Sequence, residues 1–214
     1  MDNITSIRYT QLPEDSPYVK PFRMYYVQNG TEKNWDLLKV HDSVAVIILN
    51  KTRNNLVFVR QFRPAVYHSI ISSDSDWLCV SENSTSLLKK YPVKLAITDE
   101  LCAGIVDKSK PLIEIAREEI IEECGYDVPV ERIETVMTYR AGVGTNGSLQ
   151  NLYYCEVTDD DKVTTGGGVD DEIIDVVELS IDECKKMVAQ GAVNNSPPSC
   201  LLGICWFLAN RAPK

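Results

Sequence analysis

Three glutamates that lie close together in the sequence, Glu119, Glu122 and Glu123, are the residues best placed to do chemistry. The apolar spacing of residues 111–124 predicts a helix, and positions three and four apart on a helix are neighbours, so the three carboxylates share one face. Like charges held this close raise one another's pKa unless a cation compensates them. Mg²⁺ prefers such oxygen ligands and fills its remaining positions with water and substrate phosphates. The cluster therefore predicts a metal site for phosphate chemistry, with a solvated helix face as the ordinary alternative.

The segments around this helix must hold it in place. An apolar arc beside the carboxylates predicts that the helix docks on a core, and the arc consists of Ile113, Ala116, Ile120 and Cys124. Gly104 stands before the helix, and Gly125 follows it, where a glycine is favoured at a helix C-terminus. We therefore expect the acidic cluster at the edge of a buried face.

This frame resembles the Nudix box, G-x5-E-x7-R-E-U-x-E-E-x-G-U, in which U is apolar. The matching positions are Gly104, Glu119, Ile120, Glu122, Glu123, Gly125 and Tyr126. Two positions depart from the box, since Lys110 replaces its glutamate and Glu118 its arginine. The two replacements reverse each other's charge, and we hypothesise that they preserve a loop-to-helix ion pair with its polarity exchanged. Arg117 is the alternative residue for the role of the missing arginine.

Composition limits the classes of function. The chain has 214 residues, of which 44% are hydrophobic and 25% charged, as expected for one soluble domain with a small appendage. Its formal net charge of −9 argues against a nucleic-acid partner, which would require a basic surface. The sequence has no run of 18 apolar residues and no hydrophobic N-terminal segment, so we expect no membrane partner. Most of the seven cysteines lie in apolar runs, which favours buried, reduced thiols in a cytoplasmic protein.

The order of elements predicts the fold. Residues 23–40 form two strand-like runs around Asn29-Gly30, a strong hairpin signal. Strands at 43–50 and 55–62 follow, then a polar loop over 67–92 and a strand leading into Gly104. After the acidic helix come a strand, a glycine-rich loop at 141–147, a further strand, an acidic loop and two helices. This order predicts an α/β/α sandwich around a mixed sheet, with residues 1–41 as an arm and hairpin and residues 42–214 as the main domain.

Several residues outside the helix have side chains suited to a nucleotide. Trp35 can stack on a base and Asp36 can accept its N–H groups, although Trp35 is equally suited to packing within the hairpin. Arg60 and Arg63 can grip a diphosphate or form salt bridges at the rim of the sheet. The glycines Gly104 and Gly142 permit close approach of a substrate to the backbone.

The acidic loop at Asp170, Asp171 and Glu172 is flanked by glycines. It can close on a substrate and deliver a general base. A solvated turn is the alternative.

Segments beyond the box extend the resemblance to the UDP-sugar diphosphatase members of the ADP-ribose diphosphatase branch of Nudix hydrolases. They are HDSVAVIILN, VFVRQFRPAVY, ELCAGIVD, EECGY, GVGTNGSLQNLYYCEVTD and GICWFLAN. The resemblance implies a homodimer with exchanged N-terminal strands, in which Trp35 and Asp36 serve the partner's site and Arg63 contacts the diphosphate. It also implies the residues that hold Mg²⁺, or Mn²⁺ in its place, namely the Ala103 carbonyl, Glu119, Glu122, Glu123 and Glu172. Glu122 is also a catalytic candidate, and Asp170, Asp171 and Glu172 are rival candidates for the base.

These expectations together define a reaction. We expect Mg²⁺-dependent hydrolysis of nucleoside diphosphate sugars, with UDP-glucose giving UMP and glucose 1-phosphate. The alternatives are hydrolysis of ADP-ribose and a catalytically inactive Nudix module that binds nucleotides.

Overall fold

A computed structural model of the chain describes residues 4–73, 84–189 and 194–213. The strands are β1 (Lys20–Gln28), β2 (Thr31–Lys39), β3 (Ser43–Asn50), β4 (Asn55–Phe62), β5 (Ile97–Glu100), β6 (Cys102–Ile105), β7 (Ile133–Arg140), β8 (Leu149–Val157) and β9 (Asp175–Ser180). The α-helices are α1 (Pro64–Ile71), α2 (Ser84–Lys90), α3 (Leu112–Cys124), α4 (Ile181–Met187) and α5 (Pro198–Asn210). The described residues also include the short 3₁₀ turns η2 (Val93–Ala96), η3 (Val130–Arg132) and η4 (Asp159–Asp161).

Seven strands form one mixed sheet in the order β5-β4-β3-β8-β7, with β6 paired to β3 and β9 paired to β4. β3 and β8 are parallel, and the other pairings are antiparallel. β3 is almost entirely buried, which explains its unbroken apolar sequence, because a strand covered on both faces needs no polar side.

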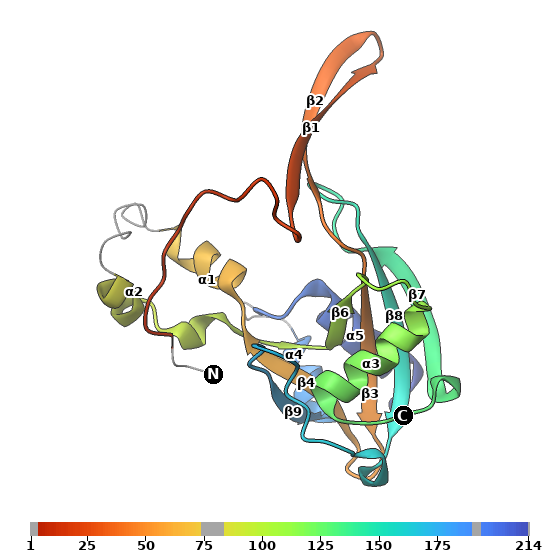
Figure 1. Cartoon of the computed structure of the whole chain (residues 1–214). Helices are drawn as coiled ribbons and strands as arrows, with labels where there is room; N and C mark the ends of the chain where they lie inside the picture. The colour runs from red at the N-terminus through yellow and green to blue at the C-terminus, as the bar shows by residue number, and fades with distance from the viewer. Residues whose placement is uncertain (1–3, 74–83, 190–193, 214) are drawn as a thin grey trace.

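Helices cover both faces of this sheet (Figure 1). Alternate residues of β3 point to opposite sides. Val44, Val46 and Ile48 join one core with α3. Ala45 and Ile47 join a second core with α4 and α5. The predicted α/β/α sandwich around a mixed sheet is therefore confirmed.

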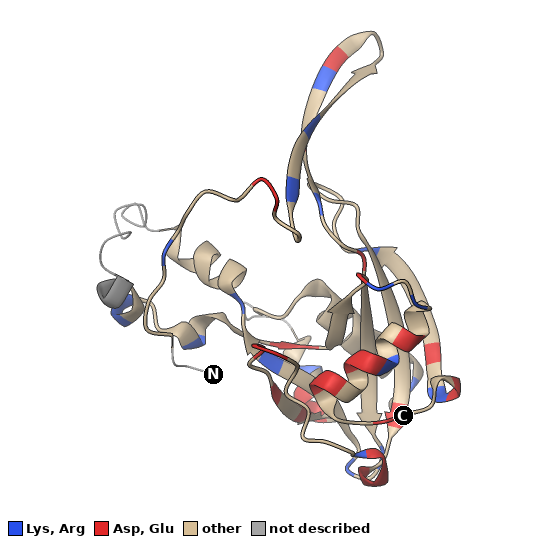
Figure 2. Cartoon of the chain, viewed as in Figure 1, with Lys and Arg blue, Asp and Glu red and all other residues tan. Residues whose placement is uncertain are grey.

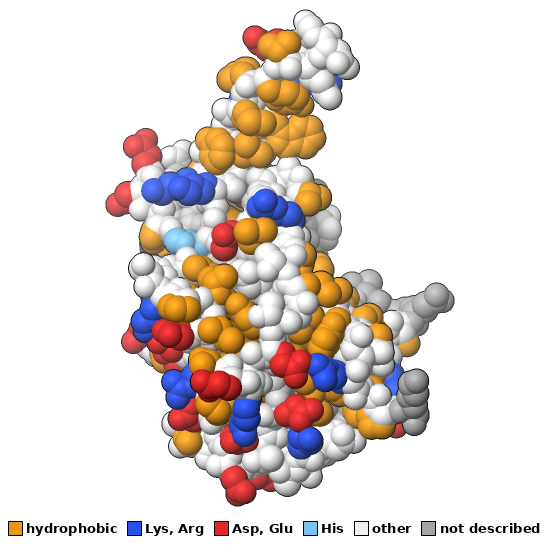
Figure 3. Space-filling model, turned by 90° about the vertical axis from the view of Figure 1, so that its right-hand side faces the viewer, with side chains coloured by type: hydrophobic (Ala, Val, Ile, Leu, Met, Phe, Trp, Pro, Cys, Tyr) orange, Lys and Arg blue, Asp and Glu red, His pale blue; other side chains and the backbone are white. Residues whose placement is uncertain are grey.

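The N-terminal hairpin is also confirmed. β1 and β2 pair antiparallel from Lys20–Lys39 to Gln28–Thr31, and the turn residues Asn29 and Gly30 have φ values of 53° and 76°. A tight hairpin turn of this kind requires positive φ at both central residues. The hairpin projects from the body as a long ribbon (Figure 1), and hydrophobic side chains cover much of it in Figure 3. The large exposed apolar side chains of β1 and β2 are Phe22, Met24, Tyr25, Val27, Trp35 and Leu38.

The loop predicted for residues 67–92 is wrong in part. β4 ends at Phe62, and Pro64 begins α1, because its fixed φ and missing N–H suit the first position of a helix. Tyr67 and Ile71 follow at helical spacing and are buried with Leu87 of α2 and Ala96. The central part of the expected loop, residues 74–83, lies outside the described residues.

Five cysteines are buried, as expected, and they are Cys102, Cys124, Cys155, Cys184 and Cys200. Cys205 is exposed on α5, so the apolar sequence of this helix does not prevent it from having an outer face. Cys79 lies outside the described residues. No helix in the described part of the chain is long and apolar enough to cross a membrane.

Candidate active site

The acidic cluster lies on helix α3, which packs against the sheet, and the acidic residues of this helix are red in Figure 2. Pro111 precedes the helix and Gly125 ends it in the left-handed conformation, with a φ of 73°. The residues buried on its inner face are Ile115, Ala116, Ile120, Glu123 and Cys124. Ile113, expected in this arc, is only partly buried. The buried face therefore includes one of the three glutamates.

Glu123 is the most deeply placed carboxylate of the cluster, with a relative exposure of 4%. Its Oε2 accepts a hydrogen bond of 2.9 Å from the backbone N–H of Ala103. The pKa of Glu123 is raised to about 8, mainly by burial and then by the carboxylates of Glu119 and Glu172, against the opposing effect of the Ala103 N–H. The predicted contribution of the Ala103 carbonyl to metal binding remains a prediction.

Glu119 lies against Gly104. A Cβ built on Gly104 would be 2.1 Å from Glu119 Cδ and from Oε1, so the glycine leaves the space that this carboxylate fills. Burial and then the neighbouring Glu122 raise the pKa of Glu119 to about 7. The structure thus gives Gly104 a packing role, and its predicted contact with substrate stays a prediction.

These carboxylates fit a divalent cation of the magnesium type. In the described ranges, no three His, Cys, Asp or Glu side chains are arranged to hold a metal ion by themselves. Mg²⁺ does not require such a cage, because it commonly binds through one or two carboxylates and completes its shell with water and phosphate oxygens. The pKa values of Glu119 and Glu123 are raised first by burial and then by neighbouring carboxylates, so these two side chains supply the negative charge that such an ion would neutralise.

The hypothesised ion pair of exchanged polarity is present. Lys110 Nζ donates to Glu118 Oε1, and Lys108 Nζ donates to Oε2 of the same carboxylate at 3.2 Å. Arg117, the alternative residue, instead bonds the Val128 carbonyl at 2.9 Å and the Asp127 carboxylate. The contact of Lys108 with Glu118 was not predicted, although Lys108 lies two residues before Lys110 in the same loop and has the same charge.

The acidic loop before β9 brings Glu172 to the cluster. The Glu172 carboxylate contributes to the raised pKa values of both Glu119 and Glu123. Asp170 and Asp171 are exposed on the same turn, where Asp170 has a φ of 52°. Glu172 is therefore the loop carboxylate that the structure relates directly to α3, and the assignment of the base remains a prediction.

Both predicted arginines already have carboxylate partners. Arg63 Nε and Nη2 each lie 2.6 Å from an oxygen of Glu100, and Glu100 also accepts a bond of 2.6 Å from Thr98 Oγ1. Arg60 makes the same two-pronged contact with Asp99, at 2.7 and 3.0 Å. The carboxylate of Glu100 raises the pKa of Arg63 most, and Glu123 and Glu172 add to this, so Arg63 is within electrostatic reach of the acidic cluster.

The hairpin residues lie elsewhere. Trp35 Nε1 donates to the Gly144 carbonyl at 2.6 Å, and Leu38 N donates to the Thr145 carbonyl at 2.7 Å, so β2 holds the glycine-rich loop. Asp36 is paired with Arg23 at 2.7 and 3.0 Å. The hairpin stands apart from α3 in Figure 1, so the structure does not bring Trp35 or Asp36 to the carboxylates of the same chain.

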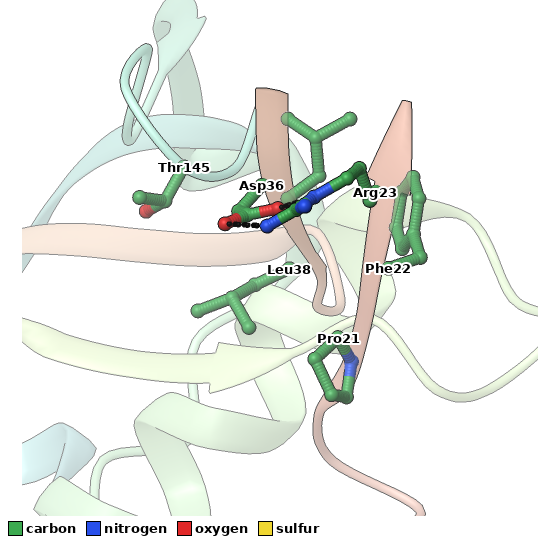
Figure 4. Close-up of a pocket in the computed structure, with 7 residues that line it drawn as sticks. Pro21, Phe22, Arg23, Asp36, Leu38 and Thr145 are labelled. Atoms are coloured by element: carbon green, nitrogen blue, oxygen red, sulfur yellow. Dashed lines mark hydrogen bonds and ion pairs between the residues drawn. The ribbon is translucent and has the colours of Figure 1, made fainter. Parts of the chain in front are cut away.

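A cavity of about 550 Å³ lies at the base of the hairpin, and Figure 4 shows the ion pair at its wall. Its lining residues are Pro21, Phe22, Arg23, Asp36, Leu37, Leu38 and Thr145. Gly142, predicted to approach substrate, packs close to Asn146 of its own loop, because a Cβ on it would lie 2.8 Å from the Asn146 amide nitrogen.

A docked helix with this glycine frame and carboxylate cluster, on a mixed sheet between two helical layers, defines a hydrolase of the Nudix class, and the chain belongs to the Nudix family. The uridine diphosphate glucose pyrophosphatase NUDT14 of Bos taurus is 37% identical over 204 residues, covering 92% of this chain and 91% of the relative. The protein of the same name from Mus musculus is 38% identical over 208 residues, with the same coverage. A GDP-mannose pyrophosphatase of Salmonella arizonae is 30% identical over 162 residues, covering 75% of this chain and 71% of the relative. No general family profile matches the chain.

Proposed function

We propose that this protein hydrolyses the diphosphate bond of nucleoside diphosphate sugars with Mg²⁺, or Mn²⁺ in its place, and that UDP-glucose is its substrate. The observation that carries this proposal is the sequence identity of 37–38% to two uridine diphosphate glucose pyrophosphatases over 92% of the chain. The carboxylate cluster on α3 supports it from the chemistry, because a diphosphate needs a cation in a protein whose net charge is −9.

The chain's own residues have distinct roles in the proposed reaction. Glu119, Glu123 and Glu172, with Glu122 beside them and the Ala103 carbonyl, would hold the cation, which when bound neutralises the diphosphate and orients water. A carboxylate of the acidic loop accepts the proton of the attacking water, and the rival candidates are Asp170, Asp171 and Glu172. The water oxygen forms a bond to phosphorus, and the bond from phosphorus to the bridging oxygen breaks. For UDP-glucose, the products are UMP and glucose 1-phosphate.

Arg63 is suited to contact the diphosphate. Its guanidinium is held by Glu100, and Glu123 and Glu172 also raise its pKa, so the charge of Arg63 lies within electrostatic reach of the acidic cluster. A planar guanidinium has five donors, so the pairing with Glu100 leaves donors for phosphate oxygens. Arg60 lies within β4, where it pairs with Asp99 of the neighbouring strand β5.

We further propose that residues 1–41 form a dimerisation unit and that a second copy of the chain receives Trp35 and Asp36. The projecting hairpin and its exposed apolar residues support this arrangement, since large apolar patches mark interaction sites. The five buried thiols suit the cytoplasm, where cysteines are kept reduced.

A panel of UDP-glucose, GDP-mannose and ADP-ribose with Mg²⁺, with the products identified, tests the substrate. We expect the highest kcat/KM for UDP-glucose, with UMP and glucose 1-phosphate as the products. A preference of tenfold or more for ADP-ribose would overturn the assignment of the sugar nucleotide, and the absence of turnover of all three would overturn the enzymatic function.

A further inference from the structure

The C-terminal end of α3 is capped by a distant segment of the chain. The last four carbonyls of a helix have no partner within it and must find donors elsewhere. Ile121 O accepts from Gly125 N at 3.0 Å, and Cys124 O accepts from Lys162 Nζ at 2.7 Å. The other two carbonyls belong to the two glutamates of the cluster, Glu122 and Glu123.

Backbone N–H groups of two consecutive glycines, Gly167 and Gly168, reach these two carbonyls. Gly167 N donates to Glu123 O at 2.9 Å, and Gly168 N donates to Glu122 O at 3.0 Å. The backbone of the acidic loop is thereby bonded directly to the residues whose side chains form the cluster.

Only glycine suits this segment. Gly166, Gly167 and Gly168 have φ values of 70°, 112° and 84°, a region that side chains disfavour. A Cβ on Gly166 would lie 2.3 Å from Glu123 O, and a Cβ on Gly168 would lie 2.5 Å from Glu172 Oε2 and 2.7 Å from Glu172 Cβ. The first contact is with helix backbone and the second with the root of the Glu172 side chain, so neither can be relieved by moving a flexible tip.

Glu172 is folded back over the last of these glycines. Its Oε2 accepts a hydrogen bond of 3.0 Å from Val169 N, and its own N–H donates to Val169 O at 3.1 Å. The position of the carboxylate therefore depends on the backbone of residues 166–169, which is itself fixed to the end of α3. Its charge acts on Glu119 and Glu123.

We propose that Gly166, Gly167 and Gly168 form a latch that positions Glu172 against the metal-binding face of α3. They are positioning residues, because they act on the reaction through Glu172 and contact the helix only by backbone. The latch sets the distance between two parts of the site that are nearly 50 residues apart in sequence, and it rests on the proposed function of these carboxylates.

A double-mutant cycle between Gly168→Ala and Glu172→Gln tests the latch. Two quantities are measured, the Mn²⁺ dissociation constant by titration and kcat for UDP-glucose. We expect Gly168→Ala alone to weaken Mn²⁺ binding and to lower kcat by about tenfold each, as for other residues that orient metal ligands. In the Glu172→Gln background, Gly168→Ala should change either quantity less than twofold, because its target is already removed.

The matched control is Gly147→Ala in the glycine-rich loop, where an added Cβ meets no atom within 4 Å. It should leave both quantities unchanged. If Gly168→Ala does not fold, Gly167→Ala replaces it in the cycle, because its Cβ would meet only Ile174 O at 3.5 Å.

Equal losses in both backgrounds would contradict the latch, because they would indicate a general effect on the fold. Wild-type Mn²⁺ binding and kcat in a folded Gly168→Ala protein would also contradict the latch. The Mn²⁺ titration separates this inference from the proposed function. If the wild-type protein turns over no nucleotide sugar but the double-mutant cycle still shows a non-additive loss of Mn²⁺ binding, the proposed function is refuted and the latch is supported.

Discussion

Reversing the charges of Lys110 and Glu118 tests whether the ion pair between these two departures from the Nudix box stabilises the fold. The two side chains have relative exposures of 44% and 28%, and Lys108, 43% exposed, also donates to Glu118. Exposed ion pairs contribute about 0.2–1 kcal/mol each. Lys110→Glu removes one such pair and adds repulsion between two carboxylates, so we expect the free energy of unfolding to fall by about 1 kcal/mol.

The single change Glu118→Arg should cost a similar amount. It removes both ion pairs of Glu118 and places a guanidinium beside Lys108 and Lys110. In the double variant, the introduced carboxylate faces the introduced guanidinium, and only the repulsion from Lys108 remains. We therefore expect the double variant to lie within about 0.5 kcal/mol of the wild type, which gives a coupling energy of about 1–2 kcal/mol.

Urea-induced unfolding in metal-free buffer of low ionic strength measures all four proteins of this cycle. Lys110→Gln is the control, because it removes the ion pair without adding a like charge and should cost only about 0.5 kcal/mol. The coupling should shrink in 1 M salt, where exposed charges are screened. A coupling below about 0.3 kcal/mol at low salt, the size of ordinary additivity errors, would refute a compensating exchange of charges.

Three further predictions concern the site, the hairpin and the core. The pKa values of Glu119 and Glu123 are raised to about 7 and 8 in the folded state, above their ordinary value of 4.5, so folding without metal is favoured by their protonation and should lose this contribution as the pH rises from about 5 to 8. The increase in Tm on adding Mg²⁺, measured by thermal unfolding, should therefore be larger at pH 8 than at pH 6, and an equal increase at both pH values would contradict this prediction. Trp35→Phe removes the hydrogen bond to Gly144 and should raise the KM for UDP-glucose several-fold with little change in kcat, and an unchanged KM would exclude a binding role for the indole. Gly203→Val should lower the free energy of unfolding, measured in urea titrations, by about 1–3 kcal/mol. Even a Cβ at this position would lie 2.8 Å from the Leu101 side chain and 3.1 Å from that of Ile47, so unchanged stability would show that α5 has room to move.

Local sequence signals predicted the elements whose causes are local. Asn29-Gly30 predicted the hairpin because few other dipeptides accept two positive φ values. The glycine frame and the helical spacing of the glutamates predicted α3 and its acidic face. The sign reversal at Lys110 and Glu118 predicted their contact, since the box itself fixes which loop position faces which helix position.

Features that depend on distant partners were not predictable in this way. Arg60 and Arg63 were predicted to grip a diphosphate or to form salt bridges at the rim, and the salt bridges are present; their partners Asp99 and Glu100 lie on a neighbouring strand that the sequence does not identify. The polar composition around residues 72–86 obscured the apolar residues of α1, which are buried by contacts with η2 and α2. The glycines at 166–168 suggested a flexible loop, whereas the N–H groups of Gly167 and Gly168 bond the end of α3.

We propose that the carboxylates of α3, of which Glu123 is the most deeply buried, carry Mg²⁺-dependent hydrolysis of UDP-glucose. The most direct measurement compares kcat for UMP release by Glu123→Gln with that by Glu114→Gln, an identical change on the exposed side of the same helix. We expect a loss of at least about a hundredfold for Glu123→Gln, because a metal ligand loses its charge, and no change for Glu114→Gln. UMP release that persists unchanged in a folded Glu123→Gln protein, or that falls equally in both variants, would contradict the account.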